Sequence, residues 1–140
     1  MSRIFWDSNL FIYFLEGNDE RSAATKKLRK SMLDRGDQLL TSTLTVGEIL
    51  VKPTRVGNQA LARLYEDVLG RTATILPFDM NAARRYAMIR SSTSIRGPDA
   101  IQLACASAAR VDLFVTNDRR LQGKLVEGIQ FIVPLDQVPI

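Results

Sequence analysis

The chain has 140 residues, with 19 lysines and arginines, 15 aspartates and glutamates, no histidine and one cysteine. The absence of histidine excludes a Ser-His-Asp triad, a Cys-His pair, His-pair ribonuclease chemistry and a His-containing zinc site. The single cysteine, Cys105, excludes an internal disulfide and a cysteine metal cluster, and it favours a reducing cytoplasm. Any chemistry must therefore depend on carboxylates, hydroxyls, lysines or a carboxylate-bound metal.

The formal net charge of +4 favours a polyanionic partner such as a nucleic acid. No run of uncharged residues exceeds ten, whereas a membrane span needs roughly 18. Near the N-terminus, Asp7 and Glu16 interrupt any signal-like apolar stretch. We therefore expect neither a membrane segment nor a secretory signal.

Short apolar runs that predict buried strands alternate with segments of helical spacing. Strands are expected at residues 3–6, 38–41, 74–76, 113–116 and 130–133. Helices are expected at residues 8–15, 20–35, 43–51, 58–70, 79–92 and 98–109, with Pro53 ending the third and mobile loops at 52–58 and 91–97. The alternation predicts a single α/β domain over residues 1–140, with a mostly parallel five-stranded sheet flanked by helices.

Four acids stand apart because each lies in an otherwise uncharged segment. Asp7 follows the first strand and Asp118 the fourth, so both are expected at the edge where parallel strands end. Glu48 falls in the middle of a helix, on an apolar face, and Asp99 begins the helix at 98–109. Connectivity alone leaves Asp99 at either end of the sheet.

Each aspartate also has an ordinary structural interpretation. Asp7 and Asp118 could cap helices, and Asp99 could be a first-turn acid favoured by the helix dipole. Taken together, however, clustered carboxylates without histidine repel one another unless a divalent cation neutralises them. Carboxylate oxygens suit Mg²⁺ or Mn²⁺.

Four segments then resemble, in order, the signature motifs of PIN-domain nucleases, particularly the VapC-type toxins of bacterial and archaeal toxin–antitoxin pairs. They are FWDSNLFIY (5–13), TSTLTVGEIL (41–50), PDAIQLA (98–104) and VTND (115–118). The resemblance implies a PIN-like α/β fold with helices on both sheet faces, and one or two Mg²⁺ or Mn²⁺ ions held by Asp7, Glu48, Asp99 and Asp118. It also implies that Asp99 reaches the same edge as the others. One departure, Leu121 where an aromatic often stands, concerns packing.

A carboxylate-held metal activates water for in-line attack on a phosphodiester, which needs no histidine. RNA products should then carry 5′-phosphate and 3′-hydroxyl ends, because water and not the ribose 2′-hydroxyl attacks. Asp7 and Asp99 are the expected main ligands, completed by Glu48 and Asp118 directly or through water.

Further residues are candidates for supporting roles. Three are expected to orient the acids through hydrogen bonds, with capping or turn formation as the alternative: Thr116, Asn9 and Ser42. Three bases near the acids are expected to contact RNA phosphates, with solvated surface charge as the alternative: Arg96, Arg119 and Arg120.

The leading hypothesis is therefore a metal-dependent endoribonuclease that acts as a cytoplasmic toxin. The resemblance further implies a homodimer and a VapB-like antitoxin partner. An alternative is a non-catalytic PIN-like module for nucleic-acid binding or assembly. A phosphatase-like domain beginning at Asp7 is disfavoured, because it needs a second acid where Asn9 stands.

Overall fold

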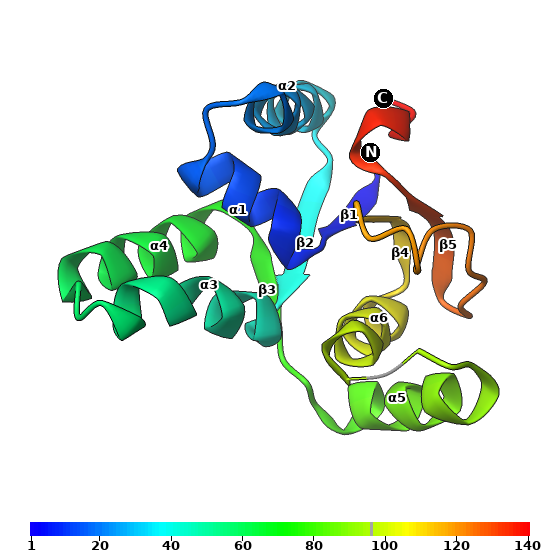
Figure 1. The fold of residues 1–140 in the computed structure, drawn as a ribbon. Coiled ribbons are helices and arrows are strands. Elements are labelled where there is room, and N and C mark those ends of the chain that lie inside the picture. Colours follow the sequence, from blue (N-terminus) through cyan, green and yellow to red (C-terminus); the bar gives the residue numbers. More distant parts are fainter. Residues whose placement is uncertain (96) are drawn as a thin grey trace.

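Five parallel strands form the centre of the molecule, in the order β3-β2-β1-β4-β5 (Figure 1). The computed structural model describes residues 1–95 and 97–140. The strands are β1 (Arg3–Trp6), β2 (Gln38–Ser42), β3 (Thr74–Leu76), β4 (Val111–Val115) and β5 (Ile129–Val133). Every pair of neighbouring strands is parallel, which confirms the predicted α/β fold.

Helices connect the first four strands, and a segment of turns (116–128) connects β4 to β5. The helices are α1 (Ser8–Glu16), α2 (Glu20–Arg35), α3 (Thr43–Arg55), α4 (Gln59–Thr72), α5 (Met80–Ser92) and α6 (Gly97–Ala109), followed by a 3₁₀ turn η1 (Leu135–Gln137). Side-chain oxygens that accept a backbone N–H cap the first five, at Asp7, Asp19, Ser42, Asn58 and Asp79. None of the helices in the described part of the chain is both long and apolar enough to cross a membrane.

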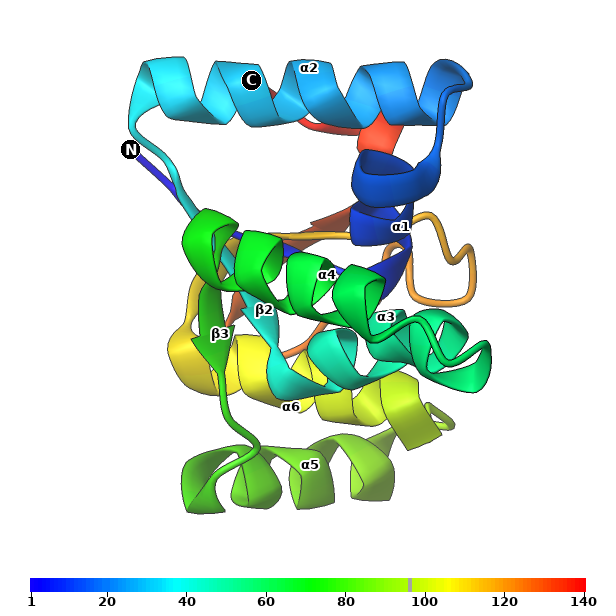
Figure 2. The ribbon, with the colours of Figure 1, turned by 90° about the vertical axis from the view of Figure 1, so that its left-hand side faces the viewer.

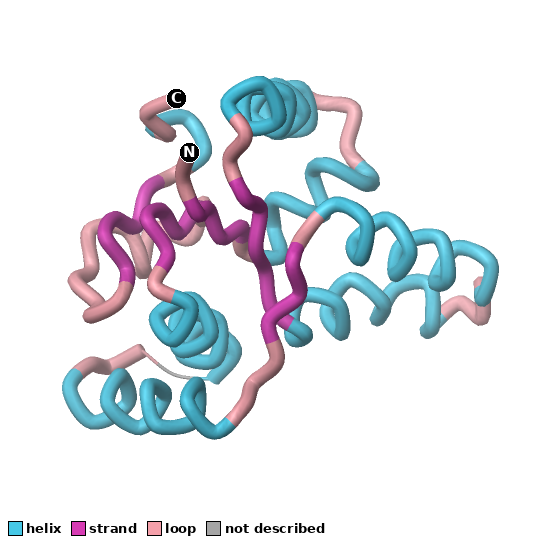
Figure 3. The backbone as a smooth tube through the Cα atoms, turned by 180° about the vertical axis from the view of Figure 1, so that it is seen from behind, coloured by secondary structure: helices cyan, strands magenta, loops and turns pink. Residues whose placement is uncertain are grey.

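Both faces of the sheet are buried, because successive strand residues point to opposite faces. On β1, Ile4 and Trp6 pack into the core formed with α1 to α4, while Phe5 packs into the core formed with α5 and α6. Figure 2 shows α5 and α6 together below the sheet, and Figure 3 shows the same layers from behind. The sheet edge at the strand C-termini remains between these layers.

Two helix ends differ from the prediction. α3 continues past Val51 to Arg55 with Pro53 inside it, so the loop predicted from Lys52 is wrong over its first four residues. Proline in the last turn removes only one backbone donor, and Pro53 is buried, so its packing favours the longer helix. α4 likewise runs through Gly70 to Thr72, because glycine is tolerated in a helix whose other residues support it.

Candidate functional site

Asp7 lies directly after β1, and the residue is 7% exposed. Its Oδ1 accepts the backbone N–H of Ser8 at 2.8 Å, so it does cap α1. Its Oδ2 accepts the Thr116 hydroxyl at 2.8 Å, and the amide of Gln102 lies 3.5 Å from Oδ1. Burial raises the pKa of Asp7, the hydrogen bonds lower it, and the nearby charge of Asp118 raises it. The cap is therefore also a charge-bearing group within an acidic cluster.

Thr116 connects two of the acids. It follows β4 and is fully buried, and the same hydroxyl that donates to Asp7 accepts the backbone N–H of Asp118 at 3.1 Å. Asp118 begins the turn after β4, where Arg120 pairs with it at 2.8 Å. That guanidinium holds the pKa of Asp118 below its ordinary value.

Asp99 lies at the same edge, which resolves the question that connectivity left open. It stands in the first turn of α6, and Arg120 Nη2 lies 3.4 Å from its Oδ2 while also contacting Asp118. Burial raises the pKa of Asp99, as do the charges of Asp118 and Asp7, and Arg120 opposes them. Three carboxylates from distant segments thus lie close enough to affect one another.

Glu48 reaches the cluster from α3, but from the surface and not from the apolar face. The buried face of α3 carries Thr45, Ile49 and Pro53, spaced by four, and Glu48 is rotated away from it and exposed. The expected apolar placement is therefore wrong. Partial burial still raises the pKa of Glu48, the Ser8 hydroxyl lowers it, and the charges of Asp7 and Asp99 raise it.

Sequence reasoning missed Gln102 as a functional residue. It is 2% exposed, and its amide donates to the Thr45 hydroxyl at 2.7 Å as well as approaching Asp7. Ser42, the cap of α3, donates to its Oε1, so Ser42 reaches Asp7 only through this amide. The available signal was spacing: Gln102 follows Asp99 by three residues, which places both on one side of α6.

The remaining candidates are placed differently. Asn9 is exposed on α1, and no hydrogen bond joins it to the four acids within the described ranges. Arg119 is exposed beside Asp118, and Arg120 lies on the acids themselves. Arg96 falls outside the described residues.

The chemistry of the donor set fits a divalent cation, since four carboxylates supply hard oxygen ligands and three of them have raised pKa values. No group of three or more acidic, histidine or cysteine side chains in residues 1–95 and 97–140 is already arranged to hold a metal ion. Binding a cation would therefore require the acids to draw closer. Glu48, which is exposed on α3, has the freedom to do so.

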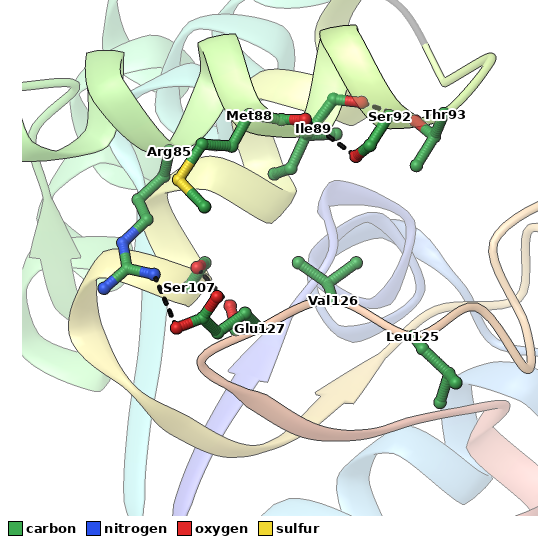
Figure 4. Close-up of a pocket in the computed structure, with 9 residues that line it drawn as sticks. All are labelled: Arg85, Met88, Ile89, Ser92, Thr93, Ser107, Leu125, Val126 and Glu127. Carbon is green, nitrogen blue, oxygen red and sulfur yellow. Dashed lines mark hydrogen bonds and ion pairs between the residues drawn. The ribbon is translucent and has the colours of Figure 1, made fainter.

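Other hollows lie outside this cluster, and two of them matter for comparison. A polar cleft of about 550 Å³ adjoins Asp118 and is lined by Glu20, Arg21, Ala24, Asn117, Arg119, Gln122, Pro134, Leu135, Asp136 and Gln137. A smaller cavity of about 150 Å³ lies between α5, the end of α6 and the segment before β5 (Figure 4). The residues labelled in Figure 4 include none of the four acids and none of their neighbours in the sequence, whereas the cleft is lined by Asn117 and Arg119, on either side of Asp118.

Comparison with known proteins gives consistent results. The model of the PIN domain family matches residues 4–124. No curated protein matches the chain. Among solved structures, DNA-bound VapBC from Salmonella typhimurium is similar with a TM-score of 0.73 and 20% identity, covering 96% of this chain and 99% of that one.

VapBC2 from Rickettsia felis bound to a promoter DNA fragment is similar with a TM-score of 0.70 and 15% identity, covering 94% of this chain and 98% of that one. A toxin–antitoxin complex from Klebsiella pneumoniae is similar with a TM-score of 0.64 and 22% identity, covering 90% and 94%. At these identities the likenesses show the fold alone. The family match, which spans most of the sequence and includes all four acids, shows that the chain belongs to the PIN domain family.

Proposed function

We propose that this chain is a VapC-type toxin, a metal-dependent endoribonuclease that hydrolyses RNA and is held inactive by an antitoxin. The observation that carries the proposal is the convergence of Asp7, Glu48, Asp99 and Asp118 from four separate segments, with electrostatic coupling among them. Mutual repulsion destabilises such a cluster unless a cation is bound there. A purely structural role would not require four acids from separate segments to lie close together.

Asp7 and Asp99 would hold a Mg²⁺ or Mn²⁺ ion, with Glu48 and Asp118 completing the ligand set. When bound, such an ion activates water and neutralises charge on the phosphate. The residues around it fix the ligands: the Thr116 hydroxyl and the Ser8 N–H orient the two oxygens of Asp7, and Gln102 ties Asp7 to α3 through Thr45. Because these hydrogen bonds already fix the side chain of Asp7, little conformational entropy would be lost when the cation binds.

Single-stranded RNA would approach along the polar cleft beside Asp118. The cleft holds two arginines, Arg21 and Arg119, that would contact phosphates, beside two acids, Glu20 and Asp136. The amides of Gln122 and Gln137 would contact bases or sugars. The excess of bases over acids in the whole chain supports a polyanionic substrate. Arg119 lines this cleft. Arg120 instead forms ion pairs with Asp99 and Asp118.

The VapBC assemblies among the similar structures support a VapB-like antitoxin as partner. We also propose homodimerisation, which the resemblance to VapC-type toxins implies, and action in the cytoplasm, consistent with the free cysteine Cys105.

The test is cleavage of single-stranded RNA by the purified chain in Mg²⁺ or Mn²⁺, with EDTA as the blank. Asp7→Asn and Asp99→Asn should each lower the rate by at least about a hundredfold, as expected for loss of a metal ligand. Asp34→Asn is the matched control, because Asp34 is exposed on α2, far from the four acids in sequence, and pairs with Lys30 at 2.9 Å. It should cleave like the wild type.

Cleavage that is equal in EDTA, or equal in Asp99→Asn, would refute the proposed mechanism. RNA binding without any cleavage would support the alternative, a non-catalytic PIN-like binding module.

A further inference from the structure

Arg120 is the cation that occupies the acidic cluster in this structure. Its Nη2 lies 2.8 Å from Asp118 Oδ2 and 3.4 Å from Asp99 Oδ2, and its Nε lies 3.1 Å from Asp118 Oδ1. The backbone N–H of Arg120 donates to the same Asp118 oxygen at 3.0 Å. One guanidinium thus bridges two acids that come from α6 and from the turn after β4.

Arg120 is held there loosely enough to exchange. Its side chain is 80% exposed, and solvent-exposed ion pairs are weak. The two contacts are unequal: Asp118 is chelated by three donors from Arg120, whereas Asp99 receives a single long contact. The contact of Arg120 with Asp99 is therefore weaker than its contact with Asp118 and breaks first.

No other lysine or arginine in the part of the chain that the structure describes forms an ion pair with any of the four acids. The neighbouring base, Arg119, lines the polar cleft. Within residues 1–95 and 97–140, the acids are also not yet spaced as a metal site. A guanidinium and a divalent cation would therefore compete for the same oxygens of Asp99 and Asp118.

We propose that Arg120 is an internal counter-cation that exchanges between the acids and the RNA. Without a divalent cation it bridges Asp99 and Asp118, which limits their repulsion. When a cation binds, Arg120 releases Asp99, stays tethered beside Asp118, and contacts an RNA phosphate at the mouth of the cleft. This inference rests on the proposed function and adds a regulatory step to the same site.

The proposal predicts opposite changes in two affinities of one variant. In Arg120→Gln, Mn²⁺ should bind about two- to fivefold more tightly, because the competing cation is gone. The same variant should bind a short single-stranded RNA about three- to tenfold more weakly in Ca²⁺, because a phosphate contact is lost. Calorimetry on the full chain measures the first affinity and fluorescence anisotropy the second. Arg120→Lys should fall between the variant and the wild type in both.

Arg119→Gln is the matched control, since it removes the same charge one residue away. It should weaken RNA binding, but it should tighten Mn²⁺ binding less than Arg120→Gln does. If Arg120 merely holds the turn together, Arg120→Gln frees Asp118 and Mn²⁺ binds more weakly, which overturns the inference. Equal Mn²⁺ affinities in the two variants also overturn it. If the wild type binds neither Mn²⁺ nor RNA, the proposed function itself fails.

Discussion

Thr116 shows how one buried hydroxyl organises two charged groups. It donates to Asp7 and accepts from the backbone of Asp118, in a position with no solvent exposure. A buried carboxylate that loses a donor keeps its desolvation cost without the compensating bond. Single residues of this kind, more than the number of acids, determine whether the cluster is tolerated.

Thr116→Val preserves shape and removes that hydroxyl. We expect the free energy of unfolding at pH 7, measured in urea with EDTA, to fall by about 1–3 kcal/mol. Thr25→Val is the control, because Thr25 is equally buried but donates only to the Arg21 carbonyl within α2. A loss in Thr116→Val no greater than that in Thr25→Val would contradict the role given to Thr116.

The raised pKa of Asp7 predicts how the stability of the metal-free protein depends on pH. In the folded state the pKa of Asp7 lies above its ordinary value of 3.8, which applies to the unfolded state. At pH values between 3.8 and the pKa of folded Asp7, the folded state therefore binds more protons than the unfolded state. The free energy of unfolding should therefore fall as pH rises through this window. Glu48 and Asp99 act in the same direction, and Asp118, whose pKa is lowered, acts in the opposite one.

Urea unfolding in EDTA from pH 4 to pH 8 measures this dependence. Asp7→Asn removes the titrating group, so the fall in stability with rising pH should become smaller. An unchanged pH dependence in that variant would show that the raised pKa of Asp7 does not cause the loss of stability.

At the scale of elements, two glycines near the ends of α3 and α4 have different backbone conformations. Gly57 follows α3 with φ of +71°, whereas Gly70 lies inside α4, and at each position a Cβ would meet nothing within 4 Å. Backbone conformation alone therefore decides the effect of adding a methyl group.

Gly57→Ala should lower the free energy of unfolding by about 1 kcal/mol, because an L-residue is strained at positive φ. Gly70→Ala should raise it by about 0.5–1 kcal/mol, since alanine favours the helix. Urea unfolding of the two variants side by side checks both signs. A stabilising Gly57→Ala would place the end of α3 elsewhere.

The same region shows the limit of local sequence reasoning. Apolar runs and capping residues predicted the strands and most helices within one or two residues, because each signal is contained in the element itself. Pro53 and Gly70 were interpreted as helix ends, yet tertiary packing of the flanking turns keeps both inside helices. Proline and glycine raise the free energy of a helix that contains them, and tertiary packing determines whether that cost is offset.

For the whole molecule, the topology brings acids that are up to 111 residues apart to one edge of the sheet. The sequence placed Asp7 and Asp118 at this edge because each follows a strand of a parallel sheet, and the pairing of β1 with β4 in the structure brings the two together. The contacts of Gln102 and the bridging by Arg120 did not, because they depend on how α6 and a turn pack against the sheet. Sequence therefore predicted which acids gather, but not what holds them.

Cation binding should stabilise the whole fold by linkage. A ligand that binds only the folded state adds about 2.7 kcal/mol at a hundredfold excess over its Kd. Differential scanning fluorimetry should show a higher Tm in Mn²⁺ than in EDTA for the wild type and for Asp34→Asn. The gain should be largely lost in Asp99→Asn, and an equal gain in that variant would place the cation elsewhere.

The central claim is that the four carboxylates form a divalent-cation site. The most direct measurement is a crystal structure of the chain grown with Mn²⁺, located by its anomalous scattering. We expect a peak with oxygens of Asp7 and Asp99 within about 2.0–2.6 Å, and Arg120 withdrawn from Asp99. A peak away from these residues, or none at a saturating Mn²⁺ concentration, would contradict it.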